Sequence, residues 1–189
     1  LKFLYIYLNH IGKKQRKLLN KKLEQIKLEK IYASNFTRAK ETAEDFAKKH
    51  KKRIYTDERL NEVDWTDWYK IKYFNMSEKA RVKKIAQYRQ VDKKLHQLHT
   101  KSRRLLADIY KHNKGKRVGL FCHGNIIRAM ITSIISTDVI GFLSMEIYQS
   151  SVTKIVIDRD GYIKINYINN ICHLPHKPDE DLFMAALNQ

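Results

Sequence analysis

The chain has 189 residues, of which 38 are Lys or Arg and 20 are Asp or Glu, so its formal charge at pH 7 is +18. This length suits a single domain with a sizeable core, and we expect one domain over residues 1–189. The two cysteines exclude a disulfide framework, and no apolar run approaches the roughly 18 residues of a membrane-spanning helix. We therefore expect a cytoplasmic protein with no metal, no cofactor and no membrane partner.

The positive charge is concentrated in the first part of the chain. Residues 1–117 hold 33 Lys and Arg against 13 Asp and Glu. Clustered basic residues attract polyphosphates, so a nucleic-acid partner is one interpretation. No motif of interleaved aromatic and basic residues accompanies the charge, which favours lysines spread over solvent-exposed helix faces. Nucleic-acid binding therefore stays only as an outside alternative.

The first segments predict a strand and then a helix. Residues from Phe3 to Leu8 are aromatic or aliphatic throughout, which is typical of a strand buried on both faces. From Gly12 to about Ile26, apolar residues repeat with helical spacing opposite a lysine-rich face. Asn9 and His10 lie between the two predicted elements, where the strand ends.

A second strand and helix follow directly. Lys30 to Ser34 reads as a short strand, and Asn35 and Thr37 are candidate N-caps of a helix that extends to about residue 50. Arg38 therefore falls in the first turn of a helix that follows a strand. This geometry directs a polar side chain to the edge of a parallel sheet.

The middle of the chain predicts a third strand, a loop and a long helix. Arg53 to Thr56 reads as a short strand, and Asp57 to Tyr69 is polar and aromatic without a clean period, which indicates a loop. Ser77 to about Asn113 has helical periodicity and is strongly basic. We interpret the region from about 70 to 115 as a long basic helical insert.

The most informative stretch is VGLFCHGNIIR, residues 118–128. The apolar run from Val118 to Cys122 predicts a buried strand that ends on His123; Gly124 supplies a turn, and Asn125 opens a helix. An imidazole beside the N–H groups of a helix N-terminus favours an anion, phosphate above all. The alternative interpretation is a core histidine next to a glycine turn.

The last predicted elements complete the fold class. Val152 to Ile157 and Tyr162 to Ile168 alternate in polarity and are joined by a turn, which predicts a hairpin. The order of elements predicts an α/β fold, a three-layer sandwich with a mixed, mostly parallel sheet flanked by helices. Because the carboxyl ends of parallel strands meet at one edge, we expect Arg38 and His123 to converge there.

Four stretches together resemble the histidine phosphatase superfamily, whose fold is phosphoglycerate mutase-like. They are IYASNFTRAKETAE at 31–44, DERLNEVDWTDW at 57–68, VGLFCHGNIIR at 118–128, and the C-terminal pair SVT at 151–153 and HLP at 173–175. The resemblance implies that Arg38 binds phosphate, that Glu62 is the general acid, and that His123 is a catalytic histidine followed by Gly124 and Asn125 at the phosphate site. Trp65 and Trp68 resemble the phosphatase branch more than the mutases.

The resemblance also implies a reaction. Family members hydrolyse a phosphomonoester through a phosphohistidine: a histidine on the first strand attacks phosphorus, arginines and a second histidine bind the phosphoryl oxygens, and a carboxylic acid protonates the leaving group. A neutral imidazole is a good nucleophile near pH 7, and the developing charge needs preorganised donors. The implied partner is a small phosphorylated substrate, and the chemistry needs no metal.

The first catalytic motif departs from the family pattern. Where the family has Arg-His-Gly, this chain has Asn9, His10 and Ile11. In one alignment His10 is the nucleophile and the loop after it is shortened. In the other, residues 8–15 match the helix entry that follows the loop, and the nucleophile is missing. The alternatives are an active phosphatase using His10, a catalytically impaired member that binds phosphorylated ligands through Arg38, His123 and Asn125, and a shortened sequence.

Overall fold

The computed structural model describes residues 5–64 and 78–175, and for residues 78–90 it describes the backbone only. The helices, the 3-10 helix and the strands follow in chain order: α1 (His10–Ile26), β1 (Lys30–Ala33), α2 (Thr37–Lys49), β2 (Ile54–Thr56), η1 (Glu58–Leu60), α3 (Glu78–His112), β3 (Val118–Phe121), α4 (Gly124–Ile134), α5 (Val139–Leu143), β4 (Val152–Ile157) and β5 (Ile163–Asn170).

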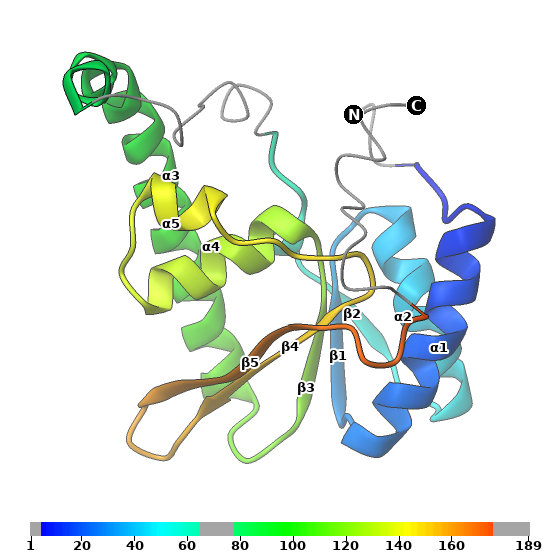
Figure 1. Cartoon of the computed structure of the whole chain (residues 1–189). Helices are drawn as coiled ribbons and strands as arrows, with labels where there is room; N and C mark the ends of the chain where they lie inside the picture. Colours follow the sequence, from blue (N-terminus) through cyan, green and yellow to red (C-terminus); the bar gives the residue numbers. More distant parts are fainter. Residues whose placement is uncertain (1–4, 65–77, 176–189) are drawn as a thin grey trace.

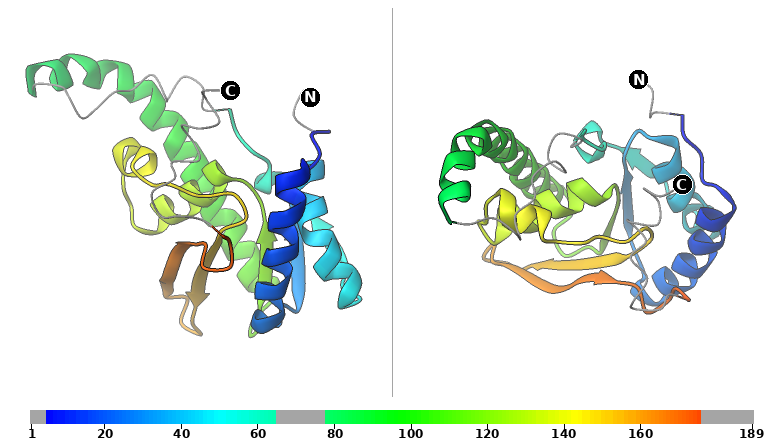
Figure 2. Two further views of the ribbon diagram at one scale, coloured as in Figure 1. Left: turned by 45° about the vertical axis from the view of Figure 1, so that its right-hand side comes forward. Right: turned by 45° about the horizontal axis from the view of Figure 1, so that its top comes forward.

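The described strands form two sheets. A parallel sheet has the order β2-β1-β3, and β4 and β5 form a separate antiparallel hairpin. Figure 1 shows α1 and α2 on one side of the parallel sheet and α3, α4 and α5 on the other. In the turned views of Figure 2 the β4–β5 hairpin lies along one side of the layers formed by the parallel sheet and its helices. The α/β fold class predicted from the sequence is therefore confirmed, with the sheet flanked by helices on both sides.

Alternating side chains of the sheet build two cores. Ile31 and Ala33 of β1 are fully buried in one cluster with the apolar residues of α1 and α2. Tyr32, between them, packs on the other cluster, which α3, α4 and α5 supply. On β3, Phe121 packs into the first cluster and Leu120 against the second. This period of two is what a strand covered on both faces requires.

The three parallel strands end at the same edge of the sheet. Ala33 of β1 lies opposite Thr56 of β2 and Phe121 of β3. Beyond this row, the Ser34 N–H donates to the Phe121 carbonyl at 2.9 Å, and the Asp57 N–H donates to the Ala33 carbonyl at 3.1 Å. The segments that leave the strands are thus held side by side. Side chains on all three can converge, as expected for parallel α/β sheets.

The described part of the predicted first strand is not a strand. Residues 1–4 lie outside the described chain, and residues 5–8 have no strand pairing; Tyr5, Ile6 and Tyr7 are 46–70% exposed. The Leu8 N–H donates to the carboxylate of Glu41 on α2 at 2.8 Å. Asn9 then caps α1. The backbone of this segment is therefore tied to α2, and its apolar side chains reach neither core.

The remaining helices and strands follow the prediction with small shifts. The long helix α3 lies inside the predicted basic insert, of which residues 70–77 fall outside the described chain. The N-cap of α2 is Phe36, without a capping side-chain hydrogen bond, in place of Asn35 or Thr37. Within the described residues, no helix combines the length and apolar character needed to cross a bilayer.

Candidate active site

His123 lies at the centre of the candidate site. It is the N-cap residue of α4, directly after β3, and its side chain is only 7% exposed. Its ring packs against Phe36, the N-cap residue of α2, with 5.1 Å between ring centroids. The beginnings of α2 and α4 therefore meet at His123, and both helices direct backbone N–H groups to this edge of the sheet.

A buried hydrogen-bond network fixes the protonation of the His123 ring. Asn61 Oδ1 accepts the Asn35 N–H at 2.8 Å and must also accept the Ser34 hydroxyl, at 2.9 Å. Ser34 Oγ has thereby used its single proton, and it accepts the Phe36 N–H at 3.1 Å. His123 Nε2 lies 2.9 Å from the same oxygen. It must therefore be the donor, so the neutral ring carries its proton on Nε2 and a lone pair on Nδ1.

The surroundings of His123 keep its imidazole neutral. Burial, and secondarily the positive charge of Arg38, lower its pKa to about 3. A bound anion raises the pKa of a buried imidazole, because a negative charge nearby stabilises the protonated ring. His123 is thus suited to take up a proton when a dianion binds.

This lowered pKa predicts acid sensitivity of folding. In the unfolded chain His123 has its ordinary pKa near 6.5, so between about pH 6.5 and pH 3 the unfolded state binds the extra proton. The stabilisation is complete above pH 6.5 and is lost as the pH falls. We expect wild type to lose about 2 kcal/mol more than His123→Asn between pH 7 and pH 4.5.

Urea unfolding at several pH values checks this prediction. His99 and His173 also have pKa values lowered mainly by burial, so they contribute to the acid sensitivity of both proteins. The difference between wild type and His123→Asn isolates the contribution of His123. Parallel stability curves for the two proteins over this range would contradict the neutral, buried state of the ring.

Arg38 supplies the cation of the site. It is the second residue of α2, and its guanidinium carbon lies 4.9 Å from the centre of the Phe36 ring. Burial is the main effect on its pKa and lowers it, whereas the negative charge of Glu62 raises it. Because Arg38 also influences the pKa of His123, its charge reaches both groups.

Glu62 supplies the carboxyl group of the candidate site. Burial is the largest effect on its carboxyl group and raises its pKa above the ordinary value. Hydrogen bonds from the backbone N–H groups of Val63 and Asn125 oppose this rise, as do the charges of Arg38 and Arg128. The Asn125 bond means that the carboxylate occupies the N-terminus of α4. An incoming phosphate would compete with it for that position.

Gly124 and Asn125 are the first two residues of α4. Gly124 is the first residue of α4, and a methyl group there would make only ordinary contacts, the nearest at 3.8 Å from the Ile147 carbonyl. No turn at this position requires glycine. The Asn125 side chain accepts a hydrogen bond from Arg128 at 3.1 Å, so Asn125 contributes its backbone N–H to the site.

His10 is the first residue of α1, and its side chain is exposed. Cys122, next to His123, does not replace His10 as a nucleophile. Burial and the charge of Glu62 raise the pKa of the Cys122 thiol to about 12, so the reactive thiolate is absent at neutral pH.

Three residues beside the candidate site were not predicted from the sequence: Ser34, Asn61 and Arg128. Ser34 and Asn61 are small polar residues in turns, where no periodicity marks a residue that supports a catalytic ring. The only available signal was position, since Ser34 follows β1 and Asn61 precedes Glu62. Arg128 lies one helical turn after Asn125, a spacing that places both on one face of α4.

The family assignment rests on a match that covers most of the chain. A model of the histidine phosphatase superfamily, branch 1, matches residues 5–171. The chain belongs to this superfamily. The resemblance noted in the sequence is confirmed. Among curated proteins, none matches this chain.

Solved structures of histidine phosphatase relatives share the fold. A phosphoserine phosphatase from Entamoeba histolytica, in complex with phosphoserine, has a TM-score of 0.72 at 20% identity, over 89% of this chain and 87% of that one. YhfR of Bacillus stearothermophilus has a TM-score of 0.67 at 23% identity, over 88% and 86%. A mycobacterial glucosyl-3-phosphoglycerate phosphatase, complexed with VO3, has a TM-score of 0.65 at 17% identity, over 87% of both chains.

Proposed function

We propose that this histidine phosphatase family member hydrolyses phosphomonoesters of small molecules. The observation that supports this most is the meeting of Arg38, neutral His123 and the carboxyl group of Glu62 at the N-termini of α2 and α4. A guanidinium and backbone N–H groups bind phosphoryl oxygens, and a carboxyl group with a raised pKa keeps a proton for the leaving group. The fold neighbour that holds phosphoserine makes a small phosphorylated substrate the natural choice.

The proposed reaction has two steps. A histidine nitrogen attacks phosphorus, the bond to the leaving oxygen breaks, and that oxygen takes the proton of Glu62. Water then attacks the phosphohistidine and releases inorganic phosphate, while the Glu62 carboxylate takes a proton from the water. In both steps Arg38 balances the charge on the phosphoryl oxygens, and His123 can accept a proton on Nδ1 and donate it to one of them.

We propose His10 as the nucleophile, following the alignment in which Asn9, His10 and Ile11 correspond to the family's first catalytic motif. Its exposed place on α1 favours a second candidate function, the binding of phosphorylated ligands without turnover. Binding needs only Arg38, His123 and the N–H groups of α4. Hydrolysis needs, in addition, that the His10 ring reaches the phosphorus.

Hydrolysis of p-nitrophenyl phosphate, in EDTA and without added metal, separates the two candidates. If the protein is a phosphatase with His10 as nucleophile, wild type turns over and His10→Ala does not, whereas His112→Ala, which alters an exposed histidine of α3, keeps full activity. Turnover that survives His10→Ala would overturn the assignment of the nucleophile. No turnover, with inorganic phosphate still raising the Tm of wild type but not of Arg38→Ala, would establish the binding function.

A further inference from the structure

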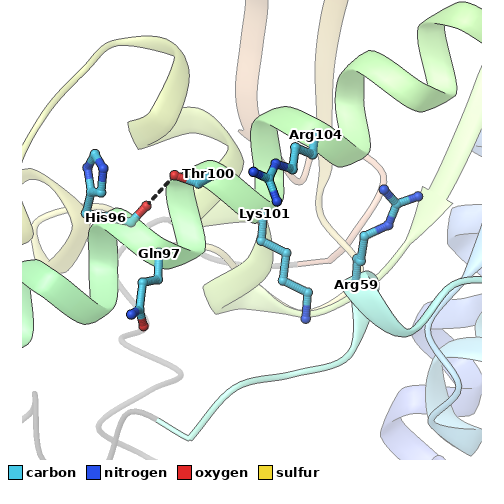
Figure 3. Close-up of a pocket in the computed structure, with 6 residues that line it drawn as sticks. All are labelled: Arg59, His96, Gln97, Thr100, Lys101 and Arg104. Carbon is cyan, nitrogen blue, oxygen red and sulfur yellow. Dashed lines mark hydrogen bonds between the residues drawn. The ribbon is translucent and has the colours of Figure 1, made fainter.

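A cavity that includes basic side chains in its lining lies between η1 and α3. It has a volume of about 510 Å³ and is lined by Arg59 of η1 and by His96, Gln97, Thr100, Lys101 and Arg104 of α3. Figure 3 shows five of these side chains along α3, with Arg59 on the neighbouring segment. A volume of this size is typical of pockets for small molecules.

The charges that line the cavity have different roles. Arg59 pairs with Asp57 at 2.7 Å and with Asp108 at 2.5 Å, so its guanidinium is fixed in the wall. Lys101 and Arg104 make no ion pair within the described part of the chain. Three cations thus face two carboxylates, and the excess positive charge rests on Lys101 and Arg104.

The charged groups of the lining favour an anion over a cation. Lys101 and Arg104 offer charged N–H donors, and the Gln97 amide offers neutral ones. The Thr100 hydroxyl donates to the carbonyl of His96 at 3.0 Å, so its proton is already used. No Phe, Tyr or Trp occurs among the described lining residues.

We propose that this cavity binds a small polyanion, a polyphosphate or a multiply phosphorylated metabolite. Two flexible cations separated by one helical turn on α3 match a ligand with more than one phosphate group. Their side chains project from one face of the helix, opposite the fixed Arg59. The described lining of the cavity does not include Arg38, Glu62 or His123.

Binding of inorganic tripolyphosphate, measured by isothermal titration calorimetry, tests the proposal. Arg38→Ala serves as the background, so that the candidate active site does not compete for the probe. In this background the double change Lys101→Gln and Arg104→Gln should weaken binding by about tenfold or more, since each removes a charge-assisted hydrogen bond. The matched control, Lys93→Gln with Lys94→Gln, removes the same charge from exposed positions of α3 and should weaken binding less than about threefold.

Two results would overturn the proposal. Equal weakening by the two double variants would show that tripolyphosphate responds to the overall charge of α3 and not to the cavity. Binding of a single-stranded RNA at least about tenfold tighter than tripolyphosphate, and lost on changing Lys101 and Arg104, would assign the cavity to nucleic acid. All four substituted residues are exposed or half-buried, and equal Tm values would verify that the variants are folded.

Discussion

Replacing Arg38 by alanine is expected to lower kcat/KM for phosphomonoester hydrolysis by about 10²–10³-fold. Arg38 is the cation whose charge reaches both Glu62 and His123, so its removal takes away the one guanidinium that acts on both groups. The loss should affect every phosphomonoester similarly, because the guanidinium binds the phosphoryl group and not the leaving group. Steady-state kinetics with two unrelated substrates measure it.

Two variants complete the Arg38 experiment. Arg38→Lys keeps the charge but loses the planar pair of donors, and we expect an intermediate activity. Arg53→Ala removes an exposed arginine that stacks on Tyr55, 5.1 Å from the ring centre, and should retain wild-type activity. If Arg38→Ala stayed within a factor of three of wild type, the phosphoryl group would bind elsewhere.

The second large effect is expected at Glu62, and it should depend on the leaving group. Glu62→Gln cannot donate a proton, so hydrolysis of an alkyl phosphate such as phosphoserine should slow by about 10²–10⁴-fold. A p-nitrophenolate leaves without protonation, so its release in the first turnover, before the phosphohistidine is hydrolysed, should change less than tenfold. The same variant removes a negative charge from the N-terminus of α4, so KM should fall as kcat falls.

The pH profile distinguishes acid catalysis from a structural role of Glu62. Its pKa is raised by burial, and only the protonated form can act as the acid. Hydrolysis of the alkyl phosphate should therefore decline as the pH rises through the Glu62 pKa, and Glu62→Gln should lose this decline. Glu58→Gln, at an exposed position of η1, is the matched control. Equal losses on both substrates, without a change in the pH profile, would indicate misplacement of the site.

Much of the site could be predicted because it rests on strong local patterns. Short apolar runs before Ser34 and Cys122, each followed by helical periodicity, define β1–α2 and β3–α4. Parallel strands end at one edge of a sheet, so the convergence of Arg38 and His123 followed from the pairing alone. Glu62 came from the family resemblance, and the structure gives it an environment that suits an acid.

The parts that could not be predicted depend on single contacts. An apolar run such as residues 3–8 has the same appearance whether or not a neighbouring strand pairs with it. In the described part, the hydrogen bond from Leu8 to Glu41 and the cap provided by Asn9 decide the outcome. Likewise, only the completed turn shows that Ser34 orients the His123 ring.

We propose that a phosphoryl group binds between Arg38, His123 and Glu62. The most direct measurement is an NMR pH titration of the histidine ring nitrogens with and without saturating inorganic phosphate. We predict that phosphate moves the titration of His123 upward from about pH 3 by about one to three pH units in wild type, and not in Arg38→Ala. An unchanged His123 titration in the presence of saturating phosphate would contradict phosphate binding beside His123.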